Sequence, residues 1–249
     1  MIRFFSIVII FLFIRFAGAQ QARDSSMIIP MFSATYSVQL PGGDLADRFG
    51  VNSLIGGTFH IKLKSNWIFG IEAGYLFGKD LREEGILDSI SDSNGEIITM
   101  YGDYSLLSIS ERGMHICGKA GKILPVLNPN ANSGILLMGG LGLLQHKIWI
   151  EVEGNNAPQI QEEYRKGYDR LTNGLALSEF IGYLYFGNSR LVNFYAGFGF
   201  VQAWTKNRRS FNFDTMEHDD RQRLDLLYSF RVGWVIPLYK RMPQKYYIY

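Results

Sequence analysis

Apolar residues alternate with small or polar residues over long stretches of this chain. In the clearest stretch, Trp67–Gly78, apolar side chains occupy every odd position, and glycine or glutamate occupies most even positions. A period of two places alternate residues on opposite faces of a β-strand. The same alternation recurs in Leu191–Lys206 and in Arg221–Tyr239. These three stretches therefore predict strands with one apolar face and one small or polar face.

Five weaker stretches complete a set of eight predicted strands. They are Met27–Leu40, Val51–Leu63, Tyr104–Val126, Ile135–Val152 and Gly174–Phe186. Long polar connections alternate with three shorter ones, at Lys64–Asn66, Leu127–Gly134 and Asn188–Arg190. Short turns at one end and long loops at the other are typical of outer-membrane barrels. We therefore expect an all-β fold, an eight-stranded antiparallel transmembrane β-barrel with up-and-down meander topology, over residues 27–239.

The first residues predict export. Arg3 precedes the apolar run Phe4–Ile14, and Ala17–Ala19 resembles a small-residue cleavage site. The run is shorter than the roughly 20 apolar residues of a spanning helix. We expect a signal peptide at residues 1–19, a periplasmic segment at 20–26 and a periplasmic tail at 240–249. An even number of strands returns both ends of the mature chain to the periplasm.

Composition narrows the class of protein further. The formal net charge of +2 is too small to predict a nucleic-acid partner. A single cysteine, Cys117, excludes an internal disulfide framework. Aromatic residues reach 14% and glycine is frequent, with 27 residues, which fits a membrane barrel with aromatic girdles.

Hairpin geometry tests the assignment of faces, because residues opposite each other in a hairpin point to the same side. A hairpin whose turn is centred on the middle of the short connection fixes which residues of the two strands lie opposite each other. The expected pairs are Glu72 with Thr58, Lys119 with Gly142, and Glu179 with Gly199. Each pair joins two positions that the alternation assigns to the lumen, so the faces agree across all three hairpins.

Four charged residues are predicted to form a lumen charge network: Glu72, Lys119, Glu179 and Arg231. An eight-stranded barrel is only wide enough for side chains to fill it, so charges inside must pair. Glu72 and Lys119 are the best pair, because they lie on adjacent strands at similar height. We expect these side chains to plug the lumen. A gated ion path is the functional alternative, and a soluble barrel is disfavoured because it would be apolar inside.

The remaining candidate chemistry is sparse. His115 and His146 are expected to face each other in the lumen, near Cys117. Two imidazoles can share a metal ion, but a third ligand is not obvious. A lipid-modifying barrel enzyme would need a lipid-facing nucleophile beside a histidine, and no His-x-Ser pattern occurs. We therefore expect no metal, no cofactor and no enzymatic activity.

The long connection from Glu153 to Asn173 is the most distinctive loop. It combines charged residues with two tyrosines, and tyrosine and arginine are favoured at interface hot spots. The predicted recognition residues are Tyr164, Arg165, Tyr168, Asp169 and Arg170. The alternative is a charged loop that contacts lipopolysaccharide phosphates or only keeps the protein soluble.

Three segments carry a resemblance to a known family. They are PGGDLADRFG at Pro41–Gly50, NWIFG at Asn66–Gly70 and KGYDRLTNG at Lys166–Gly174. With these segments the chain resembles small outer-membrane β-barrels of Bacteroidota, within the OmpA/OmpX-like superfamily. The resemblance spans nearly the whole mature chain and implies fold and compartment, but no activity. It also implies, as an alternative role, an accessory barrel of the secretion and gliding machinery of that phylum.

The sequence thus predicts an integral outer-membrane barrel of structural or partner-binding type, with a plugged lumen and recognition through long extracellular loops. The alternatives are an accessory secretion or gliding barrel, a narrow channel and a lipid-modifying barrel enzyme. Expected partners are outer-membrane lipid and lipopolysaccharide, with envelope or secretion proteins as further candidates, and no nucleic acid.

Overall fold

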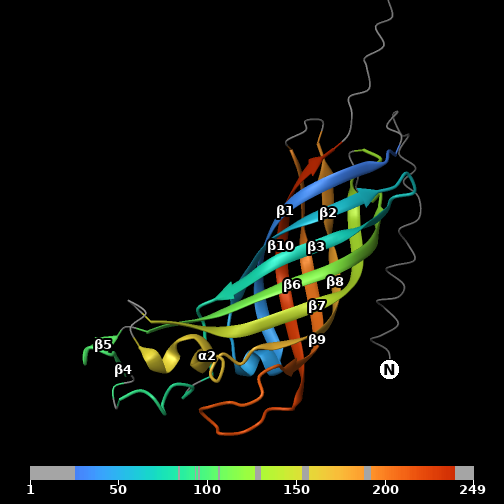
Figure 1. Cartoon of the computed structure of the whole chain (residues 1–249). Coiled ribbons are helices and arrows are strands. Elements are labelled where there is room, and N and C mark those ends of the chain that lie inside the picture. Colours follow the sequence, from blue (N-terminus) through green and yellow to red (C-terminus); the bar gives the residue numbers. More distant parts are fainter. Residues whose placement is uncertain are drawn as a thin grey trace, which may run out of the picture.

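Eight long antiparallel strands close into a barrel in the computed structural model (Figure 1). The structure describes residues 26–238, except 84, 93, 95, 106, 127–129, 153–156 and 188–191. The predicted signal peptide and the segments 20–25 and 239–249 lie outside the described residues. The barrel strands are β1 (Ile29–Gly43), β2 (Asn52–Lys62), β3 (Trp67–Gly78), β6 (Leu107–Leu124), β7 (Gly134–Val152), β8 (Thr172–Phe186), β9 (Asn193–Asn207) and β10 (Gln222–Pro237). The predicted eight-stranded antiparallel meander is confirmed.

The chain runs up and down around the ring, and β1 pairs with β10 to close it. The long connections gather at one rim, where their described residues form β4 (Ile97–Ile98), β5 (Tyr104–Ser105) and three short helical turns (Figure 1). These turns are η1 (Asp44–Asp47), η3 (Pro158–Ile160) and α2 (Glu162–Arg165). The start of β1 and the end of β10 lie at the opposite rim, beside the short connections (Figure 1). We call these two ends the loop rim and the turn rim.

The register of the three hairpins departs from the expected one in two cases. Glu72 lies opposite Thr58, as predicted. Lys119 lies opposite Gly140 instead of Gly142, a shift of two residues that keeps every side chain on its predicted face. Glu179 lies opposite Phe200 instead of Gly199. A shift of one residue moves a whole side-chain set to the other face, so the prediction for β8 was wrong.

The outer face of the wall is an apolar belt. Large side chains alternate outward along every barrel strand, and many are more than half exposed, including Ile71, Leu141, Leu175 and Phe198. Trp67 and Trp234 project outward near the turn rim, and Trp204 projects outward toward the loop rim. Aromatic side chains at both edges of an apolar belt are typical of membrane barrels.

The interior is layered. An apolar cluster that includes Ile29, Ile68, Phe180 and Val235 fills the lumen near the turn rim. A second apolar cluster begins above mid-height and continues into the loops, where it includes residues of η1 and η3. Charged and polar side chains lie between these clusters and are buried with them. No helix in the described part of the chain is long and apolar enough to cross a membrane.

Candidate functional site

Three charged side chains meet at mid-height in the lumen. Lys119 from β6 donates to Glu72 of β3 at 2.6 Å between Nζ and Oε2. Arg231 from β10 donates to the same Oε2 at 2.6 Å through Nη1. β10 and β3 are three strands apart around the ring, so Arg231 reaches across the lumen to make this contact. We call these three residues the lumen triad.

The lumen triad is fully buried and closely packed. The side chains of Glu72, Lys119 and Arg231 are 1%, 3% and 3% exposed. Arg231 also donates through Nε to Ser37 Oγ at 3.0 Å, and His115 Nδ1 lies 3.8 Å from the other oxygen of Glu72. One carboxylate therefore bridges two cations, and removal of the carboxylate would leave both cations buried without an anion. Charges inside so narrow a barrel must pair, and this arrangement pairs all three.

The fourth predicted lumen charge, Glu179, does not join the triad. Its side chain lies on the exposed face of β8, between outward-facing Leu177 and Ile181. The reason is the one-residue shift in the β8–β9 register, which points Ser178 and Phe180 inward instead. The prediction that Glu179 faces the lumen is therefore corrected: the carboxylate faces outward.

The predicted histidine pair is also separated. His115 lies opposite Leu144, and His146 lies opposite Gly113, although both imidazoles face the lumen and are buried. Among the described residues, Glu72, His115 and Cys117 bring potential metal ligand atoms within 4.8 Å of one another. Lys119 and Arg231 already neutralise Glu72, and their positive charges oppose a metal cation at this place.

A second polar group lies closer to the loop rim. His146 Nε2 lies 2.9 Å from Asp225 Oδ2, and Thr205 donates to the same oxygen. Asn52 donates to Glu111 at 2.9 Å on the same inner wall. Phe49 covers His146 edge-on, with the ring centroids 5.7 Å apart. Asp225 lies on the buried inner face of β10. Its partner His146 comes from a strand 79 residues earlier, and spacing along the sequence does not predict that contact.

The five predicted recognition residues divide into two groups. Tyr164 is 63% exposed, and Arg165 lies half-buried with its guanidinium 5.1 Å from the centroid of Trp149. Tyr168, Asp169 and Arg170 are buried, with exposures of 5%, 3% and 5%. Only the first group has surface to offer a partner, and the role of recognition stays a prediction for it.

Tyr168, Asp169 and Arg170 instead make contacts between the long loops. Arg170 donates to Glu83 at 3.0 Å and also to Asp214, so it joins three connections at the loop rim. Asp169 accepts from Arg209 at 2.7 Å. The hydrogen bonding of Arg209 with Asp169 raises the pKa of Arg209 above its ordinary value. Tyr168 packs edge-on against Phe213, at 5.6 Å between centroids.

Arg48 makes contacts between loops that the sequence interpretation missed. Its side chain is 8% exposed, contacts Glu83 at 3.3 Å and Asp219 at 3.7 Å, and donates to Thr172 Oγ1 at 3.1 Å. Arg223 adds a contact to Asp219 at 2.6 Å. Burial alone would raise the pKa of Asp219, but the hydrogen bond and charge of Arg223 outweigh burial and lower this pKa. We call the ion pairs of Arg48, Arg170 and Arg223 the rim network.

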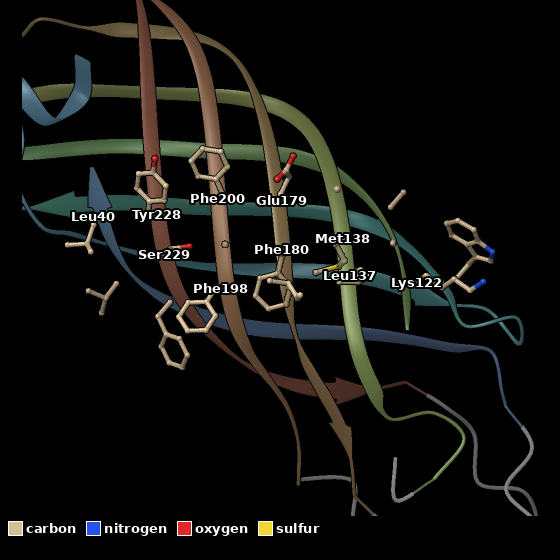
Figure 2. A pocket seen from close by; sticks show the side chains of 18 residues that line it. Leu40, Lys122, Leu137, Met138, Glu179, Phe180, Phe198, Phe200, Tyr228 and Ser229 are labelled. Atoms are coloured by element: carbon tan, nitrogen blue, oxygen red, sulfur yellow. The ribbon is translucent and has the colours of Figure 1, made fainter. Parts of the chain in front are cut away.

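In the described part of the chain the outer wall carries three hollows, and two of them contain charged side chains. The third, of about 530 Å³, is lined by Tyr36, Ile55 and Phe194, among others. The larger of the two charged hollows, of about 960 Å³, is lined by residues from seven strands, and Glu179 lies in line with Phe200 and Tyr228 on its wall (Figure 2). The smaller, of about 540 Å³, lies at the loop-rim edge of the belt and is lined by Tyr75, Arg112, Lys147 and Trp149, among others.

No family model matches the sequence, and no curated protein matches it. Among solved structures, the chain is similar to Ail, the attachment invasion locus protein of Yersinia pestis, in complex with the heparin analogue sucrose octasulfate. Identity is 10%, coverage is 84% of this chain and 99% of Ail, and the TM-score is 0.42. It is also similar to the outer membrane protein OprG from Pseudomonas aeruginosa, with 12% identity, coverage of 86% and 97%, and a TM-score of 0.39. Identities this low say nothing about activity or partners.

Proposed function

We propose that this chain is an integral outer-membrane β-barrel with a plugged lumen, which serves as a rigid platform for binding at its outer surface. One observation carries the proposal: the apolar face of the barrel is outside and the charged face is inside. Ile71, Leu141, Leu175 and Phe198 are 64–72% exposed, whereas the side chains of the lumen triad are at most 3% exposed. Water would solvate this protein poorly, but lipid matches its belt.

Closure of the lumen favours a platform over a channel. The triad bridges the barrel at mid-height, and the apolar cluster around Ile68, Phe180 and Val235 fills the space toward the turn rim. An ion on its way through would have to separate Arg231 from Glu72 and then cross an apolar layer. Both steps are costly in a low-dielectric interior. We expect no steady unit conductance from the folded protein in planar bilayers.

The arrangement of histidines favours a binding protein over an enzyme. His60, His115 and His146 are at most 2% exposed and face the lumen, away from lipid. The fourth histidine, His218, is exposed in the loop between β9 and β10 and packs edge-on against Phe211. In the described strands, no histidine shares the outer face with a serine, as a lipid-facing hydrolase would require. We therefore propose no catalytic role.

The orientation follows from the rims. Short connections face the periplasm in outer-membrane barrels and long loops face outward, so we place the turn rim and both chain ends in the periplasm. Cysteine substitutions test this placement in a Cys117→Ser background, since the native thiol is buried. Asp88→Cys and Thr215→Cys should react with an impermeant maleimide on intact cells, and Ser65→Cys should react only after lysis. The reverse pattern would overturn the orientation.

The smaller hollow suggests one partner, the phosphates of lipopolysaccharide. Arg112 lies 5.9 Å from the ring centroid of Tyr75, and Lys147 lies 4.9 Å from that of Trp149. Arg165 approaches Trp149 as well. Two cations at the outer edge of an apolar belt match an anionic headgroup whose acyl chains lie against the wall. Arg112→Gln with Lys147→Gln should reduce co-purified lipopolysaccharide, whereas Lys206→Gln, on the far side of β8, should not.

A further inference from the structure

Glu179 is an ionisable side chain in an otherwise apolar part of the belt. Among the described strand residues, the outward-facing charges are Arg112, Lys122, Lys147, Glu151, Glu179 and Lys206. All except Glu179 lie near one of the two rims. The outward neighbours of Glu179 on β8 are Leu175, Leu177, Ile181 and Tyr183. No hydrogen bond or ion pair joins Glu179 to another described side chain.

The register gives the height of Glu179. A row of paired residues that starts at Pro30 on β1 passes through Ile61, Phe69, Ala120, Gly139, Glu179, Phe200 and Tyr228. It returns to β1 at Leu40, ten residues nearer the loop rim. The row therefore climbs steadily around the barrel, and Glu179 is reached little more than halfway up. For a belt about 25 Å tall, this height is close to the middle of the membrane.

The nearest outward cation is too far away in height to pair with Glu179. Lys122 lies on β6, two strands lower on the climbing row and two residues further toward the turn rim. With a rise of about 3.3 Å per residue and a strand tilt of about 40°, the difference in height is roughly 10 Å. Figure 2 shows Lys122 well apart from Glu179, and its ammonium lies 5.4 Å from the ring centroid of Trp67.

The wall beside Glu179 is hollow. Gly139, its partner on β7, has nothing within 4 Å of the position where a Cβ would point, and Ala120 is the next residue along the row. Leu137, Phe198 and Phe200 surround this gap and complete the larger hollow (Figure 2). Small residues let another backbone approach closely within a membrane. The site therefore offers space for a neighbouring membrane segment, and the outward-facing carboxylate of Glu179 lies beside that space.

We propose that the hollow around Glu179 docks a membrane-embedded segment of a different protein, one that presents a lysine or arginine at mid-membrane height. The inference rests on the proposed outer-membrane location. A charged side chain in the bilayer is costly unless it has a partner, which makes such a residue a marker of a site. Charge complementarity requires the partner to supply a cation at the same height.

Two other occupants fit less well. A second copy related by a two-fold axis along the barrel would meet Glu179 at equal height, where the described outer faces offer only apolar residues or a second Glu179. A lipid places its headgroup at the edge of the belt, roughly 10 Å or more from this carboxylate, and its acyl chains carry no hydrogen-bond donor. Only a protein side chain on a spanning segment brings a cation to this depth.

Photo-crosslinking in native outer membranes tests the proposal. The full chain would carry p-benzoylphenylalanine at Phe198, beside the hollow, or at Ile55 as a control. Both residues are outward-facing and more than half exposed, and β2 lies four strands from β8 in either direction around the ring. We expect a discrete protein adduct from position 198 that is absent from position 55.

The charge of Glu179 must control that adduct. Glu179→Gln should reduce its yield roughly 3- to 20-fold, the range expected for one polar contact in a membrane, and Glu179→Asp should retain it. Mass spectrometry of the adduct should then identify a spanning segment with a lysine or arginine. Exchange of that cation for glutamate, combined with Glu179→Lys, should restore the adduct that either change alone removes.

Each other outcome counts against docking of a cationic segment. An adduct of twice the chain mass would indicate a second copy, and lipid adducts alone would indicate a lipid site. A protein adduct insensitive to Glu179→Gln would remove the role of charge, and the absence of any adduct would overturn docking itself. Sedimentation with the outer membrane and the heat-shifted mobility of the folded barrel check the proposed function separately. If the chain lacks both, the proposed function fails before the docking inference is reached.

Discussion

Glu72 and Glu179 lie on opposite faces of the same wall, at heights that the strand register places within about 2 Å of each other. In the lumen, Glu72 is 1% exposed and bridges Lys119 and Arg231. On the outer wall, Glu179 is exposed and its neighbours are apolar. A glutamate side chain is thus buried and ion-paired in the lumen, whereas on the outer wall a glutamate is exposed to a neighbouring molecule.

The difference indicates separate roles for the two regions: the lumen charges stabilise the barrel, and the outer hollow is proposed to bind a partner. In the lumen triad, each charged side chain finds a partner of opposite charge within this chain. The outer hollow is incomplete, because no cation among the described residues lies within reach of its carboxylate. Substitutions at the two glutamates should therefore change stability in opposite directions.

The largest effect is expected from Glu72→Leu. It leaves Lys119 and Arg231 buried without their anion, and loss of one partner of a buried pair costs about 3–5 kcal/mol. The urea midpoint of the reconstituted barrel, and the temperature at which its folded band disappears in gels, should both fall.

Lys119→Leu is the matched control, because it leaves the Glu72–Arg231 pair in place and should cost less. Glu72→Leu combined with Lys119→Leu should recover only part of the loss, since Arg231 remains stranded. Equal losses in both single variants that simply add in the double would contradict a shared network.

Arg170→Ala should have the second largest effect, about 1.5–3 kcal/mol, because two carboxylates at the loop rim lose their buried donor. The rim network lies outside the apolar belt, so the loops should open while the barrel stays folded. Proteolysis of intact cells should cut the loops faster, with no change in the heat-shifted band. Arg165→Ala, which removes a half-buried cation stacked on Trp149, serves as the control and should leave proteolysis nearly unchanged.

Acid should loosen the rim network through Asp219. Its pKa is lowered in the folded protein, so its contribution to stability is present above the unfolded value of 3.8 and is lost as the pH falls through the lower folded pKa. Cleavage of the loops by pepsin should therefore increase as the pH falls below 3.8. Asp219→Asn should show a smaller difference between pH 6 and pH 3 than the wild type. An unchanged pH response in this variant would exclude Asp219 as the group responsible.

Most of the barrel could be predicted from alternation alone, because an outward apolar face and an inward polar face leave a period of two in the sequence. The bounds of β3 agree residue for residue with the predicted stretch. Glu72 and Lys119 could be paired because both face the lumen at similar height on adjacent strands, and β3 does pair directly with β6. Arg231 was placed in the lumen, but its reach across the barrel to Glu72 depends on closure, which local pattern does not encode.

The face of β8 was predicted wrongly because two patterns disagreed there. The charge of Glu179 suggested the lumen, whereas Leu175, Leu177 and Ile181 on the same face suggested lipid. The aliphatic side chains decided the outcome, because three apolar residues gain more from lipid than one carboxylate loses. On β8 the large aliphatic residues therefore predict the outward face better than the charge does. The charge that interrupts their apolar pattern, Glu179, lies in the outer hollow.

The rim network was beyond reach from sequence for a different reason. The segments PGGDLADRFG and KGYDRLTNG carry the family resemblance, but they lie far apart in the sequence, and their contact leaves no local pattern. Arg48 of the first donates to Thr172 of the second across 124 positions. Tyr168, Asp169 and Arg170 looked like exposed hot spots because composition reports residue type and not burial. The long loops instead use these side chains to bind one another.

The smallest effect, with the opposite sign, is expected from Glu179→Leu. It removes a carboxylate from the middle of the lipid-facing belt and extends the apolar surface of Leu177 and Ile181. Lipid-facing charges destabilise a barrel near the midplane, and acidic ones do so less than basic ones, so the isolated variant should gain about 1 kcal/mol in urea unfolding. Ser178→Leu, one residue away but directed into the packed lumen, should instead lose stability through overpacking. A loss in Glu179→Leu comparable to that in Glu72→Leu would place the carboxylate in a structural role within this chain, and the contrast between the two glutamates would fail.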